Sequence, residues 1–97
     1  MRARYTAFTL AHASYLLASW HPDTRPPEIV FDESQRWLGL KILAREQGAR
    51  LDATGTVEFV ARYKIDGRAH RLHEISRFGR VAGYWVYIDG DLRDNDT

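Results

Sequence analysis

The chain has 97 residues, the length of one small domain rather than two. With 44% hydrophobic and 28% charged residues, its composition is globular and excludes a disordered chain. Fourteen Lys and Arg against 13 Asp and Glu give a net charge of +1, too balanced to steer the chain onto nucleic acid or an anionic membrane. The sequence has no cysteine, which excludes disulfides, thiol catalysis and thiolate zinc sites.

The first predicted element is a helix of about four turns. One broad face recurs at spacings of three and four, formed by Tyr5, Phe8, His12, Tyr15, Leu16 and Ser19. Pro22 ends the helix, because the residue before a proline is disfavoured in the α region. His12 and several hydroxyl residues interrupt the stretch, so it predicts neither a secretory signal nor a membrane span. A cytoplasmic protein is therefore expected.

An irregular connector is predicted at residues 23–27, where prolines and polar residues cluster. Asp32 followed by Gln35 three residues later has the form of a capping box. The pattern predicts a short helical turn near residues 33–36.

Strand-like segments then follow one another to the end of the chain: residues 37–45, 56–65, 68–78 and 84–88. Asp66-Gly67 between the second and third is a strong hairpin signal. A helix followed by antiparallel strands predicts an α+β fold, with an N-terminal helix packed on a sheet of about four strands. Residues 1–90 are expected to form one domain, and the acidic residues 91–97 a disordered tail.

The hairpin also predicts which side chains share a face of the sheet. A two-residue turn pairs Ile65 with Arg68, and even parity at the next turn would pair Phe78 with Trp85 and Glu74 with Asp89. One face then carries Val57, Phe59, Ala61, Tyr63, Leu72, Phe78, Trp85 and Tyr87, with the polar residues Glu74, Ser76 and Asp89 among them.

An apolar recess with a few convergent polar groups predicts a ligand site. Its expected lining is Trp20, His21, Phe59, Tyr63, Glu74, Ser76, Trp85 and Tyr87. Glu74 and Asp89 on neighbouring strands would raise one another's pKa, which makes each a candidate base, with His21 as auxiliary acid. Structural alternatives stay open: a bond from Glu74 to a backbone amide or an arginine, a turn capped by Asp89, and a helix end held by His21. No spacing typical of a metal, nucleotide or serine-hydrolase site occurs, so no metal or cofactor is expected.

The opposite face combines basic and apolar side chains: Arg62, Arg71, His73 and Arg77 with Val60, Ile75, Val86 and Ile88. This pattern is compatible with a protein contact, including a homodimer, with a solvated face, or with nucleic acid. Nucleic acid is the least favoured, because Glu58 interrupts the basic residues and no exposed aromatic side chain is interleaved for base stacking.

Six blocks in order resemble the bacterial YchJ family: residues 1–8 (MRARYTAF), 15–22 (YLLASWHP), 37–40 (WLGL), 57–63 (VEFVARY), 72–78 (LHEISRF) and 85–90 (WVYIDG). The resemblance implies an NTF2-like (cystatin-like) domain, a curved antiparallel sheet wrapped around helices, in a functionally uncharacterised family. Family members usually carry a cysteine-rich SEC-C zinc motif before the Arg-x-Arg-Tyr block. No such motif stands before Arg2 in the 97 residues, and an omitted or lost upstream arm is the hypothesis; Ile75 stands where the family often has a basic residue.

Two functions follow as hypotheses. The first is a non-enzymatic binding or accessory module for a small ligand or a protein partner, which the SEC-C resemblance would link to protein export or ribosomes. The alternative is a small-molecule lyase or isomerase, with Glu74 or Asp89 as base and Trp85, Tyr87 and Phe59 as apolar walls.

Overall fold

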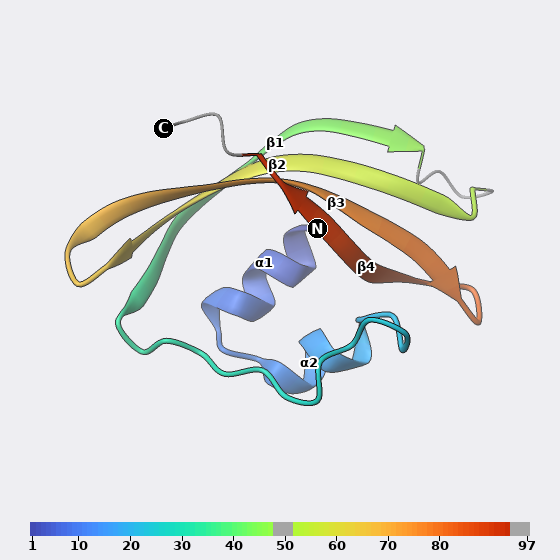
Figure 1. Ribbon diagram of the computed structural model, residues 1–97, viewed down its shortest axis with the longest axis horizontal. Coiled ribbons are helices and arrows are strands. Elements are labelled where there is room, and N and C mark those ends of the chain that lie inside the picture. The colour runs from blue at the N-terminus through green and yellow to red at the C-terminus, as the bar shows by residue number, and fades with distance from the viewer. Residues whose placement is uncertain (48–51, 94–97) are drawn as a thin grey trace.

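The computed structural model describes residues 1–47 and 52–93. Four strands form one antiparallel sheet in the order β1-β2-β3-β4. They are β1 (Gln35–Gln47), β2 (Thr54–Ile65), β3 (Arg68–Val81) and β4 (Tyr84–Leu92). Helices α1 (Arg2–Thr9) and α2 (Ala13–Ala18) lie beneath the arch of the sheet, and the connector to β1 runs past them (Figure 1). We call the sheet face toward the helices the inner face, and the opposite one the outer face. This is the predicted α+β architecture.

The expected long helix is two short ones. The chain turns at Ala11, whose φ of 52° is left-handed. The Ala11 N–H donates to the Phe8 carbonyl at 3.2 Å and the His12 N–H to the Ala7 carbonyl at 2.8 Å, the hydrogen-bond pattern of a Schellman motif. Such motifs usually carry glycine at the left-handed position, and alanine there hides the break from sequence inspection.

The capping-box prediction at residues 33–36 is wrong. The Asp32 carboxylate accepts hydrogen bonds from the Ser34 N–H at 2.9 Å and the Ser34 hydroxyl at 2.6 Å. These bonds form a turn and lower the pKa of Asp32. Strand β1 begins directly afterwards at Gln35.

The first hairpin has the predicted register. Ile65 pairs with Arg68, and the pairing continues through Tyr63 with His70 and Phe59 with Glu74. Asp66 and Gly67 both have positive φ, 50° and 80°, as a type I′ turn requires.

The second hairpin differs from the prediction. A two-residue turn pairs Val81 with Tyr84 and Phe78 with Tyr87, so the expected pairing of Phe78 with Trp85 is wrong. A bulge then shifts the register between Arg77 and Phe78, and beyond it Arg77 pairs with Asp89. Because side chains alternate along a strand, the extra residue moves Asp89 to the outer face.

The open edge of β4 is partly covered by the segment that follows α2. Trp20 forms a parallel bridge with Tyr87. The Tyr87 N–H donates to the Ser19 carbonyl at 2.8 Å and the His21 N–H to the Tyr87 carbonyl at 2.7 Å. Thr24 adds a hydrogen bond from its hydroxyl to the Ile88 carbonyl at 2.6 Å. The segment is thereby fixed against the sheet, and edge groups that could template further pairing are satisfied.

The core lies between α1, α2 and the inner face, and includes Leu16, Ala7, Phe59, Ala61 and Tyr87. Strand β4 continues through Leu92, past the domain boundary expected at residue 90. Residues 94–97 of the expected acidic tail lie outside the described residues. Within the described parts of the chain, neither helix is long and apolar enough to cross a membrane.

Candidate functional site

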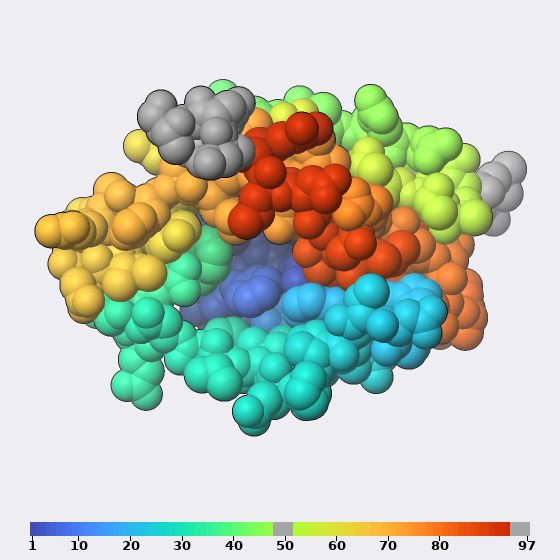
Figure 2. Space-filling view, in the orientation of Figure 1, coloured from blue at the N-terminus to red at the C-terminus, as the bar shows by residue number. Residues whose placement is uncertain are grey.

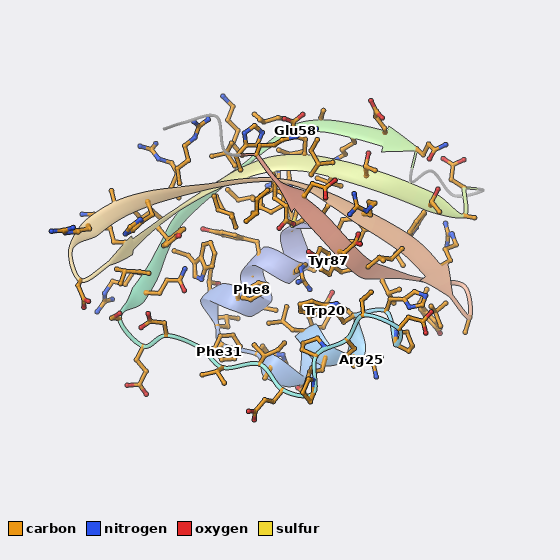
Figure 3. All side chains as sticks on the ribbon, in the orientation of Figure 1. Phe8, Trp20, Arg25, Phe31, Glu58 and Tyr87 are labelled. Atoms are coloured by element: carbon orange, nitrogen blue, oxygen red, sulfur yellow. The ribbon has the colours of Figure 1, made fainter. Side chains whose placement is uncertain are left out.

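Arg4 enters the aromatic layer of the inner face from α1. Its guanidinium carbon lies 3.7 Å from the ring centre of Tyr87, 4.4 Å from Trp20 and 5.1 Å from Phe8. Figure 3 shows Trp20 and Tyr87 facing one another beside the helix that carries Phe8. Burial lowers the pKa of Arg4, and the neighbouring Tyr87 and Glu74 offset part of that effect. The cation is thus held by ring faces as well as by charge.

Glu74 is satisfied within the fold. Its Oε2 accepts a hydrogen bond from the hydroxyl of fully buried Ser76, and the Tyr87 hydroxyl lies 3.5 Å from the same oxygen. Burial, reinforced by the negative charge of Glu74, raises the pKa of Tyr87 to about 12. Of the alternatives open at the sequence level, this arrangement resembles the structural one, in which Glu74 has fixed hydrogen-bond partners near an arginine.

Gly90 closes the space above Glu74. A β-carbon at position 90 would lie 2.5 Å from both Cδ and Oε2 of Glu74. The backbone of β4 therefore covers the carboxyl group, which is not exposed to an open cavity on that side.

An open recess lies on the inner face, between the start of α1, helix α2 and the sheet. Its volume is about 460 Å³, within the range of small-molecule sites. Four aromatic side chains line it: Tyr15, Phe78, Trp85 and Tyr87. Arg2, Arg4 and Arg45 also line it, and among its lining residues, all of which the structure describes, none is acidic. Figure 2 shows α1 at the bottom of an opening between β4 and the connector, so the space under the sheet is not closed from that side.

Only two of the eight residues expected to line the site, Trp85 and Tyr87, line this recess. Glu74 and Ser76 bond to one another, and Phe59 is buried in the core. Tyr63 lies at the other end of the inner face, stacked on His70 with 5.2 Å between ring centres.

The two remaining candidates from the predicted site lie apart from the recess. His21 accepts a hydrogen bond at Nδ1 from the Asp23 N–H at 3.1 Å and holds the start of the connector. Trp20 packs edge-on against Tyr87 at 5.0 Å, and the guanidinium of Arg25 donates to the Trp20 carbonyl at 3.0 and 3.2 Å (Figure 3). The structure does not bring His21, Glu74 and Asp89 together.

The expected carboxylate pair does not exist, because Asp89 lies on the outer face. Its Oδ1 accepts a hydrogen bond from Arg77 Nε at 2.5 Å, and Asp91 accepts one from the same guanidinium at 2.7 Å. Both contacts raise the pKa of Arg77. His73 on the same face is 2.7 Å from Glu58. Acidic side chains therefore lie beside two of the four basic residues predicted on this face, His73 and Arg77.

Sequence reasoning missed all three arginines that line the recess: Arg2, Arg4 and Arg45. Arg4 precedes Phe8 by four residues, a spacing that places both on one helix face, and this signal was available. Two register shifts in β1, between Trp37 and Gly39 and between Ile42 and Ala44, cancel one another, so Arg45 lies on the same face as Trp37. Plain alternation from Trp37 to Arg45 gives the same face, so this signal was also available. Within residues 1–47 and 52–93, no three His, Asp or Glu side chains converge as a metal ion would require.

Comparison with known proteins agrees with this architecture. The family model described as the YchJ middle NTF2-like domain matches residues 1–90. A solution structure of RPA3114, a SEC-C motif containing protein from Rhodopseudomonas palustris, superposes with a TM-score of 0.79 at 32% identity, over 97% of this chain and 76% of that one. The chain is thus an NTF2-like α+β domain.

Two relatives of similar sequence identify the family of the chain. A UPF0225 protein of Chromobacterium violaceum is 50% identical over 93% of this chain and 69% of its own length. The UPF0225 protein SCO1677 of Streptomyces coelicolor is 51% identical over 97% of this chain and 73% of its own. The chain belongs to the YchJ family.

Proposed function

We propose that this domain is a non-enzymatic binding module that holds a small ligand in the recess on its inner face. The observation that carries the proposal is the recess itself, which has about 460 Å³ of open volume and aromatic walls from Phe78, Trp85 and Tyr87. Ligand pockets combine such apolar walls with a small number of polar groups.

The arrangement favours binding over chemistry. General acid–base catalysis needs a titratable group within hydrogen-bond reach of the substrate. Among the described lining residues, none is His, Asp or Glu, and Glu74 is occupied by Ser76 beneath Gly90. The phenol of Tyr87 also lines the recess, but its pKa is raised to about 12, which makes it a weak acid near neutral pH. We therefore favour binding over the lyase or isomerase alternative.

The wider role is part of the same proposal. Residues 1–90 would act as one cystatin-like domain in an accessory protein. Its relative from Rhodopseudomonas palustris is described as containing a SEC-C motif, which supports a link to SEC-C proteins and, through them, to protein export or ribosome-associated work.

A fragment screen by two-dimensional NMR tests the binding role. Neutral, cationic and anionic aromatic fragments are added to the labelled chain, and we expect at least one of them to shift the Trp85 indole and Val57 amide signals. Both residues line the recess.

Matched tryptophan variants provide the control. Trp85→Phe should weaken the binding, whereas Trp37→Phe should leave it unchanged, because Trp37 does not line the recess and packs against Tyr5, Phe8 and Tyr63 elsewhere on the inner face. The proposal fails if no fragment of any charge shifts the recess signals, or if the two variants behave alike.

A further inference from the structure

The recess concentrates positive charge in a chain that is nearly neutral overall. Three of the chain's basic residues, Arg2, Arg4 and Arg45, line it. The chain as a whole has 14 basic and 13 acidic residues, so basic groups without nearby acids are not the average condition. On the outer face, by contrast, Arg77 contacts both Asp89 and Asp91.

Among the described residues, the arginines of the recess have one acidic neighbour, Glu74, which lies near Arg4 and is bonded to Ser76. Across residues 1–47 and 52–93, no acidic side chain forms an ion pair with Arg2 or Arg45. Nη1 of Arg4 is buried and has no hydrogen-bond partner among the described residues. A buried N–H without an acceptor is unfavourable. Because this atom is buried, Arg4 contributes positive charge to the wall of the recess, and the direct contact to an anion falls to Arg45.

The start of α1 adds donors to the same wall. Arg2 and Ala3 line the recess, and the first turn of α1 has no acidic residue and no side-chain cap. The first N–H groups of a helix lack intrahelical partners and carry a partial positive charge. The polar wall thus offers donors, and its charged side chains are all cationic.

Aromatic rings supply the apolar wall of the recess. Trp85 and Tyr87 line it, Arg80 covers one face of the Trp85 ring at 4.2 Å, and the Arg4 guanidinium lies 3.7 Å from the centre of the Tyr87 ring. An aromatic body could pack against this wall while its charged end reaches Arg45. Arginine suits such contacts, because its planar guanidinium forms paired hydrogen bonds with carboxylate or phosphate oxygens.

From this geometry we infer that the recess selects a small organic anion, in which a carboxylate or phosphate group is joined to a flat apolar body. The inference rests on the proposed binding function and names the chemical class of its ligand. Arg45 provides the main charged contact from the sheet, and Trp85 the apolar contact.

Probes of one shape and different charge test the inference. Dissociation constants are measured for the chain by NMR titration with 2-naphthoate, 2-naphthyl phosphate, 2-naphthamide and 2-naphthylmethylammonium. We expect at least one of the two anions to bind about tenfold more tightly than the neutral amide, the effect of one charge-assisted hydrogen bond in a partly open site. The ammonium probe should bind most weakly, and the two anions compared with each other separate carboxylate from phosphate preference.

Two arginine variants locate the effect. Arg45→Gln should reduce anion affinity about tenfold and leave amide affinity unchanged. Arg62→Gln is the matched control, since it makes the same charge change at an exposed position of β2, and should alter neither. Arg45→Lys should restore part of the anion affinity. Spectra of each variant without probe verify that the fold is intact.

Any other outcome counts against the anion inference, the proposed binding function or both. If the amide binds as tightly as the anions, or Arg45→Gln and Arg62→Gln have equal effects, the anion inference is overturned and the binding function stands. If no probe shifts the recess signals, both fail.

Discussion

Gly90 covers the Glu74 carboxyl group, and its replacement by alanine should destabilise the fold. The added β-carbon would lie 2.5 Å from Glu74 Cδ and 2.8 Å from Cγ, whereas ordinary contacts begin near 3.4 Å. Glu74 can rotate its carboxyl end away, so the clash alone does not set the cost. The cost arises because rotation removes the carboxylate from Ser76 and Tyr87.

The size of the effect follows from the burial of Ser76. Its side chain is fully buried, so no water can replace the lost acceptor. A hydrogen bond to a charged group contributes about 1.5–3 kcal/mol, and we expect Gly90→Ala to cost about 2 kcal/mol. For a domain of this size the melting temperature should fall by roughly 10 °C.

Urea denaturation followed by circular dichroism measures the cost. Gly39→Ala is the matched control, because a β-carbon at that strand position would meet no atom within 4 Å. It should be neutral or stabilise by up to about 1 kcal/mol. In a Glu74→Ala background the obstacle is gone, and the cost of Gly90→Ala should fall below about 0.5 kcal/mol, a coupling that a double-mutant cycle detects.

The reasoning is refuted if Gly90→Ala costs the same with and without the Glu74 side chain. It is equally refuted if Gly90→Ala and Gly39→Ala have the same free energy of unfolding.

Three further predictions concern backbone strain and pH. Ala11→Gly should stabilise the fold by about 0.5–1 kcal/mol, because the strain removed from a left-handed alanine exceeds the entropy that glycine adds to the unfolded chain. Ala3→Gly, within α1, should destabilise the fold. Thermal melts that rank the two variants the other way would contradict the helix break at Ala11. Gly67→Ala should cost about 1 kcal/mol, since φ at Gly67 is 80°, and unchanged urea denaturation would argue against the type I′ turn. Tyr87 should ionise near pH 12 in the folded chain and near pH 10 in the unfolded chain. Its contribution to the free energy of unfolding is therefore complete below pH 10 and falls by up to about 3 kcal/mol as the pH rises to 12. The ultraviolet absorbance of phenolate should show this late step in the wild type and lose it in Tyr87→Phe; a titration with the same late step in both would place it on another tyrosine.

The sequence predicted the sheet better than the helices. Alternating side chains marked all four strands, and Asp66-Gly67 specified the pairing of β2 with β3 residue by residue. The helix prediction failed at Ala11, because the left-handed turn there has no glycine to mark it.

The candidate site was predicted only in part. The placement of Phe59 and Trp85 on one side of the sheet followed from strand alternation, and that side does face the helices. The pairing of Glu74 with Asp89 failed, because one extra residue in β4 reverses which face the following side chains occupy. A register shift of that kind depends on packing across the sheet and has no local signature.

By itself, the sequence determined the α+β class, the order of the strands, the first hairpin and the family to which the chain belongs. The class, the strand order and the hairpin depend on neighbours along the chain, through side-chain alternation and turn chemistry, whereas the family followed from six sequence blocks that resemble it. Only the tertiary structure decided that Arg4 occupies the aromatic layer, that Glu74 is closed beneath Gly90, and that the open recess is lined by arginines and lies apart from both carboxylates. Those features depend on contacts between residues far apart in the chain, such as Arg4 with Tyr87, 83 positions later, whose geometry is set by how the strands bulge and where the helices break.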